Sequence, residues 1–414
     1  MTSESMVIVG AGHAGCRAAE ALREHGWRGT INLINAESRT PYQRPPLSKA
    51  VLAGSASISD LSMFPEGWLS AHEIDFHPGS AAKAIHRDVC RVEMADGSDV
   101  SYARLLLATG ARARRPDIPG IDNSRVCFLR DAADAENLSS QLLPGVHLVI
   151  IGGGLIGLEA AASAIRRGCA VTVIETAERI LSRSAPPSIA SMIGNLHEDA
   201  GVRFKLNSRV VEISGEDHAC AVRLGDGTEV LGDVVLVCTG NVPNTELAES
   251  AGIVVNDGIL VDPCLRTSDD RVLAAGDACR VDNQMLGIRI RSESWKSAES
   301  QGELAGRNML GAGVAHNSVP WMWSDQYDKV LQVTGYPDRG CSAVEREMES
   351  GSRLVFQLDE SSHIVAVSGF GILKDVSRGV RMGQEMVRRR IPANKPMLED
   401  RSIDLKLFVK AERD

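Results

Sequence analysis

Short apolar runs that end in glycine-rich turns are the most regular pattern along the chain. The first run, Met6–Val9, leads through Gly10, Gly12 and Gly15 into Cys16–His25, where apolar positions recur at helical spacing. This pattern predicts a strand, a tight turn and a helix. In such a turn the first glycine permits the bend, the second lets a pyrophosphate approach the backbone, and the third lets the helix pack against the strand.

The same pattern occurs again in the middle of the chain. His147–Ile151 is an apolar run, and Gly152, Gly154 and Gly157 lead from it into a second helical segment, Leu158–Arg167. An isolated glycine pattern of this kind is weak evidence of a nucleotide site. Two copies, each between an apolar strand and a helix, predict two dinucleotide-binding folds in one chain.

Each copy continues into a strand that ends at an acidic residue. Ile31–Asn35 is followed by Glu37, and Ala170–Ile174 is followed by Glu175. A carboxylate at this position accepts hydrogen bonds from the ribose hydroxyls of a dinucleotide. Because a carboxylate also repels a 2′-phosphate, Glu175 predicts a preference for NADH over NADPH at the second site.

Two positive charges lie close to Glu175 in the sequence. Arg179 and Arg183 would soften the repulsion of a 2′-phosphate if they faced the coenzyme. The alternative interpretation is that both are solvated arginines of a loop.

Three later apolar runs end in short polar sequences. Leu105–Gly110 and Val235–Gly240 both end in Thr-Gly, and Arg271–Asp277 ends in Gly-Asp. The first two extend the duplication, and the third puts a carboxylate where it could meet a sugar or ribityl hydroxyl. Two dinucleotide sites suggest that one cofactor is held permanently and the other exchanges. A nicotinamide delivers two electrons at once, and a flavin can accept the pair and release them singly, so a flavin suits the resident site. The spacing of the residues does not by itself identify the resident cofactor as a flavin.

The pattern changes near residue 320. Ser342–Met348, Arg353–Leu358 and His363–Phe370 read as strands with turn residues between them, and Leu373–Arg390 reads as a helix. We therefore expect a separate C-terminal α+β domain.

Composition narrows the functional class. Of 414 residues, 43% are hydrophobic, 24% charged and 4% aromatic, and the formal net charge is −9. These values are typical of a folded globular protein, and the acidic balance with few aromatics argues against a nucleic-acid partner. No signal peptide is evident, and the longest apolar stretch, Val146–Ile165, contains Glu159. We expect a cytoplasmic protein that does not enter a membrane.

Cysteine and histidine spacing gives no metal site. The nine cysteines include no CxxC pair, and the histidines include no HExxH pattern, so no metal is predicted.

Three motifs indicate a family. Pro41–Lys49 (PYQRPPLSK), Arg291–Trp295 (RSESW) and Pro320–Gln326 (PWMWSDQ) resemble segments of the FAD-dependent NADH:ferredoxin reductases of bacterial oxygenase systems, the family of putidaredoxin reductase and the Rieske dioxygenase reductases. Met322 stands where that family commonly has Phe. Matching features cover nearly the whole chain.

The resemblance implies an α/β fold with two Rossmann-like dinucleotide-binding domains of the glutathione-reductase-like kind, plus a C-terminal α+β domain. It implies an FAD-binding domain at residues 1–112 and 244–319, an NADH-binding domain at 113–243 and a C-terminal domain at 320–414.

The resemblance also implies cofactor contacts at matched positions. Together with the strand ends, the expected FAD contacts are Gly10, Gly12, Ala14, Gly15, Glu37, Arg44, Lys49, Ala82, Thr109, Gly110, Arg130, Gly276, Asp277, Trp295 and Trp323. The expected NADH contacts are Gly152, Gly154, Gly157, Glu159, Glu175, Arg183 and Gly240.

Lys49 and Glu159 are the residues expected at the reaction centre. The resemblance pairs them near the flavin and the nicotinamide, where they would position the rings, since hydride transfer needs alignment more than proton transfer. The alternative for Glu159 is an acid in the first helical turn that complements the helix dipole. For Trp295 and Trp323 the alternative is a place in the core.

The implied enzyme is an oxidoreductase of the ferredoxin–NAD(+) reductase type. It would pass electrons from NADH through FAD singly to an acidic 2Fe–2S ferredoxin, which supplies a haem-thiolate monooxygenase or a Rieske-type oxygenase. Basic candidates for docking the acidic partner are Arg307, Lys329, Arg388–Arg390 and Lys395. A monomer or weak homodimer is expected.

Other two-nucleotide flavoproteins remain as alternatives. Disulfide reductases and single-cysteine peroxidases need a thiol relay, but Glu37–Lys49 contains no cysteine and no CxxC occurs elsewhere. A rubredoxin or monodehydroascorbate reductase shares the expected domain plan. A binding flavoprotein like apoptosis-inducing factor would need a large basic surface, which a net charge of −9 opposes.

Overall fold

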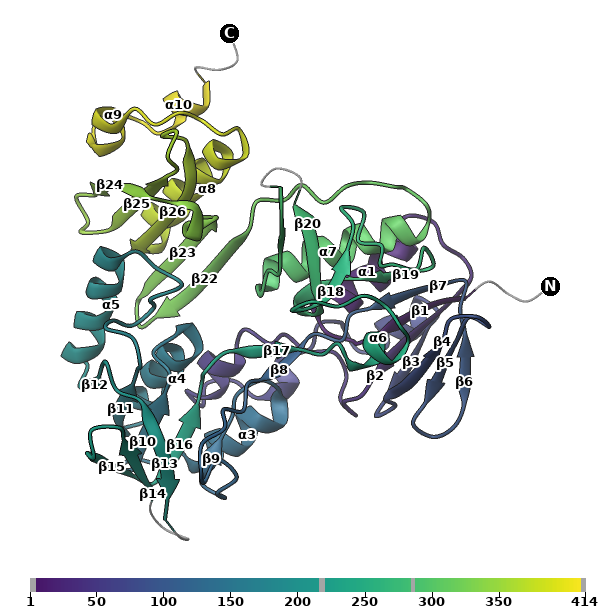
Figure 1. Cartoon of the computed structure of the whole chain (residues 1–414), viewed down its shortest axis with the longest axis horizontal. Helices are drawn as coiled ribbons and strands as arrows, with labels where there is room; N and C mark the ends of the chain where they lie inside the picture. The colour runs from purple at the N-terminus through teal and green to yellow at the C-terminus, as the bar shows by residue number, and fades with distance from the viewer. Residues whose placement is uncertain (1–4, 216–219, 284–286, 411–414) are drawn as a thin grey trace. The chain divides into compact units, whose positions relative to one another are not determined.

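The computed structural model describes residues 5–215, 220–283 and 287–410. Contacts between residues group the chain into two units. Figure 1 labels the helices and strands of both units. The first comprises Met1–Gln43, Ile58–Arg112 and Asn241–Ser318, and the second comprises Arg44–Ser57, Ala113–Gly240 and Val319–Asp414.

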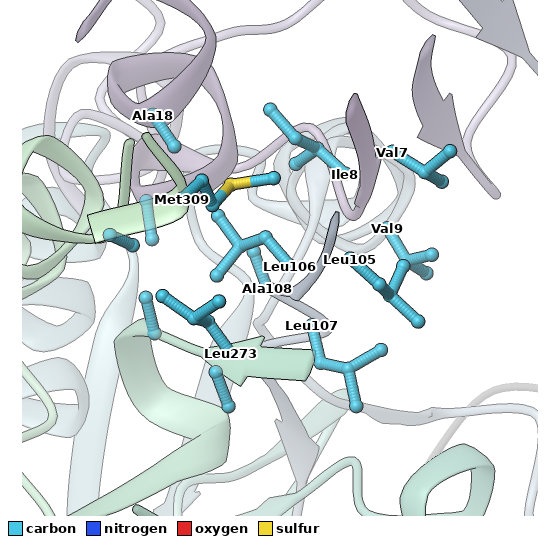
Figure 2. Packing of buried hydrophobic residues seen from close by; sticks show 14 of the residues in the cluster. Val7, Ile8, Val9, Ala18, Leu105, Leu106, Leu107, Ala108, Leu273 and Met309 are labelled. Atoms are coloured by element: carbon cyan, nitrogen blue, oxygen red, sulfur yellow. The ribbon is translucent and has the colours of Figure 1, made fainter. Parts of the chain in front are cut away.

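A five-stranded parallel sheet forms the centre of the first unit, in the order β19-β7-β1-β2-β3. Its strands are β1 (Ser5–Val9), β2 (Thr30–Asn35), β3 (Ile74–Pro78), β7 (Arg104–Leu107) and β19 (Val272–Ala274). Figure 2 shows Val7, Ile8 and Leu106 in the core that these strands build, together with Met309 from a helix. The apolar side chains of β1 are buried along its length, which is why the sequence there is a continuous apolar run.

Two helices, α1 (His13–Glu24) and α7 (Trp295–Met309), pack closely in this unit. Gly302 and Gly306 lie one turn apart on the same face of α7, and a Cβ at either position would collide with the backbone of α1. The small residues of α7 therefore bring it against the first turns of α1.

Smaller elements complete the first unit. They are α2 (Trp68–Ala71), α6 (Glu246–Ser250), the sheet of β4 (Ala82–His86), β5 (Arg91–Met94) and β6 (Asp99–Ser101), the sheet of β18 (Ile259–Val261), β20 (Cys279–Asn283) and β21 (Ile288–Ile290), and two short 3-10 turns, Ile58–Leu61 and Gly276–Ala278. The strands β8 (Ala111–Ala113) and β17 (Asn241–Pro243) pair with each other.

A second five-stranded parallel sheet, in the order β12-β11-β10-β16-β9, forms one half of the second unit. Its strands are β9 (Val126–Cys127), β10 (His147–Ile151), β11 (Ala170–Ile174), β12 (Arg203–Lys205) and β16 (Val234–Val237). The helices of this half are α3 (Ala132–Gln141), α4 (Leu155–Arg166) and α5 (Pro187–Asp199), and a small antiparallel sheet contains β13 (Val210–Ser214), β14 (Cys220–Leu224) and β15 (Glu229–Gly232).

An antiparallel sheet, β22-β23-β26-β25-β24, forms the other half of the second unit. Its strands are β22 (Trp321–Gln326), β23 (Lys329–Gly335), β24 (Ser342–Glu347), β25 (Arg353–Leu358) and β26 (Ile364–Gly371). Helix α8 (Leu373–Arg388) packs on this sheet, with Gly379 and Gly383 against Leu354 and Val367. A 3-10 turn (Pro337–Arg339), α9 (Lys395–Glu399) and α10 (Lys406–Lys410) complete the described part.

The predicted fold class is confirmed: two parallel sheets, each with a glycine turn and a helix, accompany a C-terminal α+β region. The predicted helix starts were wrong, because α1 and α4 begin at His13 and Leu155, directly after the glycine turns. Within the described ranges, no helix has both the length and the apolar composition needed to cross a membrane.

The predicted boundaries of the three domains stay a prediction. Arg44–Ser57 groups with the second unit, since Leu52 lies in the core that includes α4. The C-terminal region groups with that unit as well.

Candidate functional site

The glycine turn of the first unit leaves room for an anion. Gly10 has a φ of +107°, and a Cβ there would collide with the carbonyl of Ala108, while a Cβ on Gly15 would collide with the carbonyl of Gly10. By contrast, no atom lies within 4 Å of the Cβ position of Gly12. Helix α1 begins after Gly12, and no side chain caps its start, where the helix dipole favours a pyrophosphate. The turn therefore fits the dinucleotide that the sequence predicts.

Other predicted residues of the first unit lie in defined contacts. Tyr42 donates its hydroxyl proton to Glu37 Oε2 at 2.7 Å, and so holds the acid at the end of β2. Asp277 is half-buried in the turn after β19. Trp295 is the first residue of α7, and its ring lies edge-on to that of His13, with 6.2 Å between the ring centroids. Because Trp295 is only half-buried, it is not a core tryptophan. Ala82, at the start of β4, is half-buried against the core.

The Thr-Gly ends of β7 and β16 have related surroundings. Thr109 Oγ1 donates to the carbonyl of Asn244 at 2.7 Å, and the N–H of Asn244 donates to the carbonyl of Gly110 at 2.9 Å. In the second unit the N–H of Arg114 donates to the carbonyl of Gly240, also at 2.9 Å. These contacts close the ends of the two sheets in the same way, as duplication predicts.

The third strand end uses a residue that sequence reasoning missed. Buried Gln301, on α7, accepts the N–H of Gly276 at 2.8 Å and the thiol of Cys279 at 3.1 Å through one oxygen. Helix α7 therefore contacts two parts of the first unit: it packs against α1, and it holds the Gly-Asp turn through Gln301. No signal in the sequence connects Gln301 with a turn so far away in the chain.

The glycine turn of the second unit repeats the geometry of the first. Gly152 has a φ of +111°, and a Cβ on Gly157 would collide with the carbonyl of Gly152. The Cβ position of Gly154 is open, and α4 starts there without a side-chain cap. This turn also fits a pyrophosphate.

Glu175 is fixed by the backbone around it. Its Oε2 accepts the N–H of Gly153 at 2.8 Å, and its Oε1 accepts the N–H of Ala177 at 2.9 Å. The carboxylate is therefore held beside the glycine turn, and its remaining lone pairs suit ribose hydroxyls.

The two arginines near Glu175 differ. Arg179 donates to four backbone carbonyls of its own loop, which is a structural role. The guanidinium group of exposed Arg183 lies 3.8 Å from the Cβ position of Gly240. Arg183 therefore lies beside the end of β16, whereas Arg179 is occupied by its loop.

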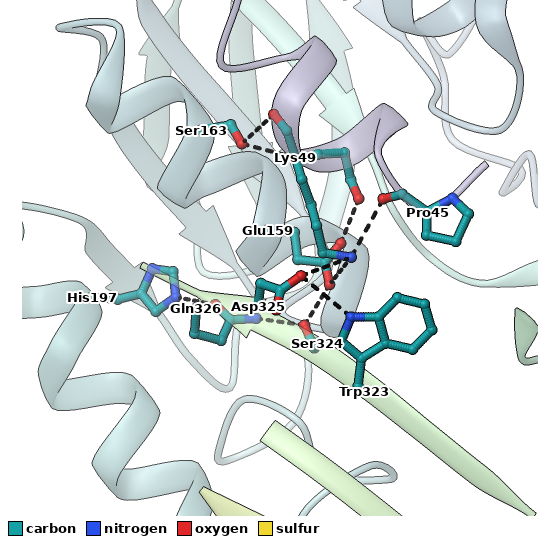
Figure 3. Close-up of polar contacts among 10 residues, drawn as sticks. Pro45, Lys49, Glu159, Ser163, His197, Trp323, Ser324, Asp325 and Gln326 are labelled. Atoms are coloured by element: carbon teal, nitrogen blue, oxygen red, sulfur yellow. Dashed lines mark hydrogen bonds and ion pairs between the residues drawn. The ribbon is translucent and has the colours of Figure 1, made fainter. Parts of the chain in front are cut away.

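Lys49 and Glu159 lie together in the second unit (Figure 3). Lys49 is in a short π-helical turn, Leu47–Val51, and its Nζ lies 3.2 Å from Glu159 Oε1 and 3.7 Å from Asp325 Oδ2. The ammonium group also lies 5.2 Å from the ring centroid of Trp323, whose indole N–H donates to Asp325 at 3.3 Å.

Glu159 is buried, with a side chain only 3% exposed. Because α4 begins at Leu155, Glu159 is not in its first turn, and the helix-dipole interpretation is wrong. Ser48 donates a short hydrogen bond to Oε2, and Ser324 donates to Oε1 at 2.5 Å. Four residues further along α4, Ser163 donates to the carbonyl of Ser48 at 2.9 Å. Side chains on one face of α4 therefore hold the π-helical turn, both by its backbone carbonyl at Ser48 and by the side chains of Ser48 and Lys49.

Ser48, Ser324 and Asp325 were not predicted as site residues. All three lie inside motifs that the sequence already singled out, Pro41–Lys49 and Pro320–Gln326, and that was the available signal. Two further predicted residues, far apart in sequence, meet in the second unit, where Arg44 donates to the carbonyl of Arg130 at 3.0 Å.

Comparison with known proteins agrees with these features. A family model described as pyridine nucleotide-disulphide oxidoreductase matches residues 4–302, and one described as reductase C-terminal matches residues 321–409. The chain belongs to the pyridine nucleotide-disulphide oxidoreductase family. The resemblance stated from the motifs is confirmed.

Individual relatives cover the chain nearly end to end. The ferredoxin–NAD(+) reductase component of an anthranilate 1,2-dioxygenase system from Burkholderia cepacia is 38% identical over 99% of this chain and 100% of its own length. A rubredoxin–NAD(+) reductase from Pseudomonas putida is 38% identical over 80% of this chain and 86% of its own. In the crystal structure of a covalent putidaredoxin reductase–putidaredoxin complex, the matched chain is 33% identical, with a TM-score of 0.91 over 99% of this chain and 98% of that one.

Proposed function

We propose that the protein is an NADH-dependent, FAD-containing oxidoreductase that reduces a ferredoxin-type protein of an oxygenase system. The observation that carries the proposal is the pair of glycine turns, each open to a pyrophosphate, in a chain with no cysteine between Glu37 and Lys49. Two dinucleotide sites without a thiol relay leave a protein or small-molecule electron acceptor as the outlet. The relatives named as ferredoxin–NAD(+) reductase and putidaredoxin reductase support a ferredoxin-type acceptor.

Residues of both glycine turns would bind the cofactors. The turn at Gly10–Gly15, with Glu37 and Asp277, would hold FAD, and the turn at Gly152–Gly157, with Glu175, would hold NADH. When bound, FAD accepts electrons as a pair from NADH and can pass them on singly. The remaining predicted contacts are part of this proposal.

Lys49 and Glu159 would order the reacting groups. The ammonium group of Lys49 is restrained by Glu159, Asp325 and the face of the Trp323 ring, so its positive charge has a fixed position. Fixed charge and restricted motion favour alignment of donor and acceptor, the main requirement of hydride transfer. No proton needs to pass through the pair.

The finer identity of the acceptor is proposed as an acidic 2Fe–2S ferredoxin, met transiently by a monomer or weak homodimer in the cytoplasm. A rubredoxin is the second candidate, because a rubredoxin–NAD(+) reductase is as identical over its matched region as the ferredoxin reductase component. The oxygenase to which the ferredoxin passes its electrons would be a haem-thiolate monooxygenase or a Rieske-type oxygenase.

Anaerobic absorbance spectroscopy of the purified protein tests the proposal. NADH should bleach the flavin rapidly and NADPH slowly, and an added 2Fe–2S ferredoxin should then reoxidise the flavin. Reoxidation by rubredoxin alone would replace the proposed acceptor with the second candidate. A preparation that neither retains nor rebinds FAD would overturn the proposal.

A further inference from the structure

A directed line of hydrogen bonds leads from Glu159 into the interior of the second unit (Figure 3). Ser324 donates to Glu159 Oε1 at 2.5 Å, and Gln326 Nε2 donates to Ser324 Oγ at 2.8 Å. The other end of the Gln326 amide, Oε1, lies 2.8 Å from His197 Nε2, and the hydroxyl of Tyr327 lies 3.3 Å from His197 Nδ1. We call Ser324, Gln326 and His197 the Ser324–His197 chain.

The direction of each bond follows from the one before it. The only hydroxyl proton of Ser324 goes to the carboxylate, so Ser324 Oγ must accept from the amide nitrogen of Gln326. The amide oxygen of Gln326 then faces His197 and requires a proton on Nε2, which leaves Nδ1 to accept from Tyr327. A single arrangement of donors therefore satisfies the whole chain.

The Ser324–His197 chain lies away from solvent and, together with Glu159, joins three elements. Ser324, Gln326 and His197 are each 0% exposed. Glu159 lies on α4, Ser324 and Gln326 on β22, and His197 on α5. In such a site a broken link leaves a polar atom without water to replace its partner, so the links are not independent of one another.

The Ser324–His197 chain ends at Glu159 Oε1, the oxygen that also contacts Lys49. Glu159 Oε1 lies 3.2 Å from Lys49 Nζ while it accepts from Ser324, and Ser48 occupies Oε2. If Ser324 turned away, Oε1 would lose one of its two partners, and the carboxylate could rotate about its Cγ–Cδ bond. The position of the Lys49 ammonium group would then be less restricted.

We propose that Ser324, Gln326 and His197 are positioning residues, which fix the carboxylate of Glu159 and through it the ammonium group of Lys49 for reaction with the nicotinamide coenzyme. The proposal rests on the proposed function, in which Lys49 and Glu159 order the reacting groups. None of the three residues needs to touch a cofactor. They act only through the orientation of Glu159.

A double-mutant cycle on the FAD-loaded protein tests this positioning role. Anaerobic stopped-flow reduction by NADH gives the limiting rate of flavin reduction and the Kd of NADH separately. Ser324→Ala and His197→Leu should each lower the limiting rate about 3- to 10-fold, the range expected for one lost hydrogen bond, with little change in Kd. The double variant should be no slower than Ser324→Ala, because the chain acts through Ser324.

A conservative variant separates positioning from a general packing defect. His197→Gln carries an amide N–H near the place of Nε2–H, so it should restore most of the rate lost in His197→Leu. Ser191→Ala, at an exposed position of the same helix, is the matched control and should react as the wild type does. Multiplied rate losses in the double variant, an effect on Kd alone, or no rescue by glutamine would each overturn the proposal.

Folding and the proposed function are checked in the same experiment. Melting temperature and flavin content are recorded for each variant. If His197→Leu does not fold, a cycle of Ser324→Ala with Gln326→Leu makes the same test without a change in α5. If NADH does not reduce the wild type, the proposed function fails and the positioning role fails with it. If NADH reduces the wild type and Glu159→Gln at the same rate, the proposed function stands, but Glu159 does not order the reacting groups and the positioning role fails. If Glu159→Gln is slow but the cycle is multiplicative, only the positioning role fails.

Discussion

At the scale of single residues, Glu159 shows how the protein keeps a carboxylate in its interior. The side chain is only 3% exposed, and removal of a carboxylate from water is costly unless charge and hydrogen bonds compensate. Here Lys49 supplies the charge, and Ser48 and Ser324 supply hydroxyl donors. The loss of one partner leaves the carboxylate under-compensated, so this cluster is more sensitive to substitution than the exposed ion pairs of the protein.

Glu175 gives the residue-scale prediction of coenzyme choice. Glu175→Gln keeps an oxygen for the N–H of Gly153 but removes the charge and one acceptor. The ratio of kcat/KM for NADH to kcat/KM for NADPH should therefore fall about tenfold, which is the effect expected from the loss of one hydrogen bond to a charged group. The measurement is kcat/KM for both coenzymes with the same acceptor.

Glu178→Gln is the control for this change, since Glu178 is an exposed acid in the same loop. Its coenzyme preference should equal that of the wild type. A wild-type preference in Glu175→Gln would mean that Glu175 does not contact the ribose.

At the scale of elements, the packing of α7 on α1 supports the first glycine turn. Gly302→Ala places a methyl group against the backbone of α1, so the helices must separate. We expect the free energy of unfolding to fall by about 1–3 kcal/mol, as for other overpacked sites, and FAD to be lost more readily because the start of α1 moves. Chemical denaturation and the flavin-to-protein absorbance ratio measure the two effects.

Ser300→Ala, on the same helix but not fully buried, is the control and should retain the stability and flavin of the wild type. If Gly302→Ala matched that control in both measurements, close approach of α7 would not be needed to shape the turn.

His197 links α5 to β22, and its burial gives a prediction for pH. Desolvation lowers the pKa of His197, which faces the neutral Gln326, the ring of Phe204 and the hydroxyl of Tyr327, whose own pKa is raised to about 12 by burial. The cation of Arg166, over the Tyr327 ring, adds no stabilisation for a charged imidazole. The folded state therefore holds His197 neutral below the pH at which the unfolded state protonates it.

The sign of the effect follows from that difference. The unfolded chain binds the extra proton as pH falls below about 6.5, so the stability contributed by neutral His197 is complete above that pH and is lost below it, by at most about 1.4 kcal/mol per pH unit. His197→Gln should flatten the fall in unfolding free energy between pH 7 and pH 5. Urea denaturation across this range measures it, and equal slopes in the two proteins would contradict the prediction. Part of the slope should remain, because burial also lowers the pKa of His147.

The sequence predicted the parts of the fold that follow local patterns, and missed those set by distant contacts. Apolar runs before glycine turns identified both parallel sheets, because buried parallel strands need no alternation. In β22 the buried positions are Ser324 and Gln326, while the tryptophans are half-buried, so its pattern opposes the usual rule and the strand was not predicted. Its partner, His197, is far away in sequence, and only the fold brings the two together.

The helix starts illustrate the same limit at the candidate site. Glycine-rich sequence at the start of α4 lacks helical propensity, so periodicity predicted a later start and put Glu159 in the first turn. The pair of Glu159 with Lys49 was expected only through family resemblance, since no spacing rule connects residues so far apart in the chain.

At the scale of the whole molecule, the net charge of −9 opposes the approach of the acidic ferredoxin that we propose as the partner. The candidate basic patch is partly compensated, because Glu385 pairs with both Arg388 and Arg389, and these arginines hold its pKa at about 2. Asp359 lies 4.0 Å from Arg390. Steering of the proposed acidic ferredoxin would therefore depend on the other basic candidates, Arg307, Lys329 and Lys395, and we expect it to be modest.

This balance predicts how electron transfer responds to salt. Exposed charges further apart than about 8–10 Å are largely screened at physiological ionic strength, so added salt should slow reduction of the acidic ferredoxin several-fold. Reduction of a neutral quinone by NADH should stay nearly level, because it needs no long-range steering. Lys329→Glu should lower the ferredoxin rate at low salt and remove much of its salt dependence, whereas Lys83→Glu, at an exposed position of β4, should not. If both acceptors responded equally to salt, or both lysine variants behaved alike, the attraction of an acidic partner to this region would be refuted.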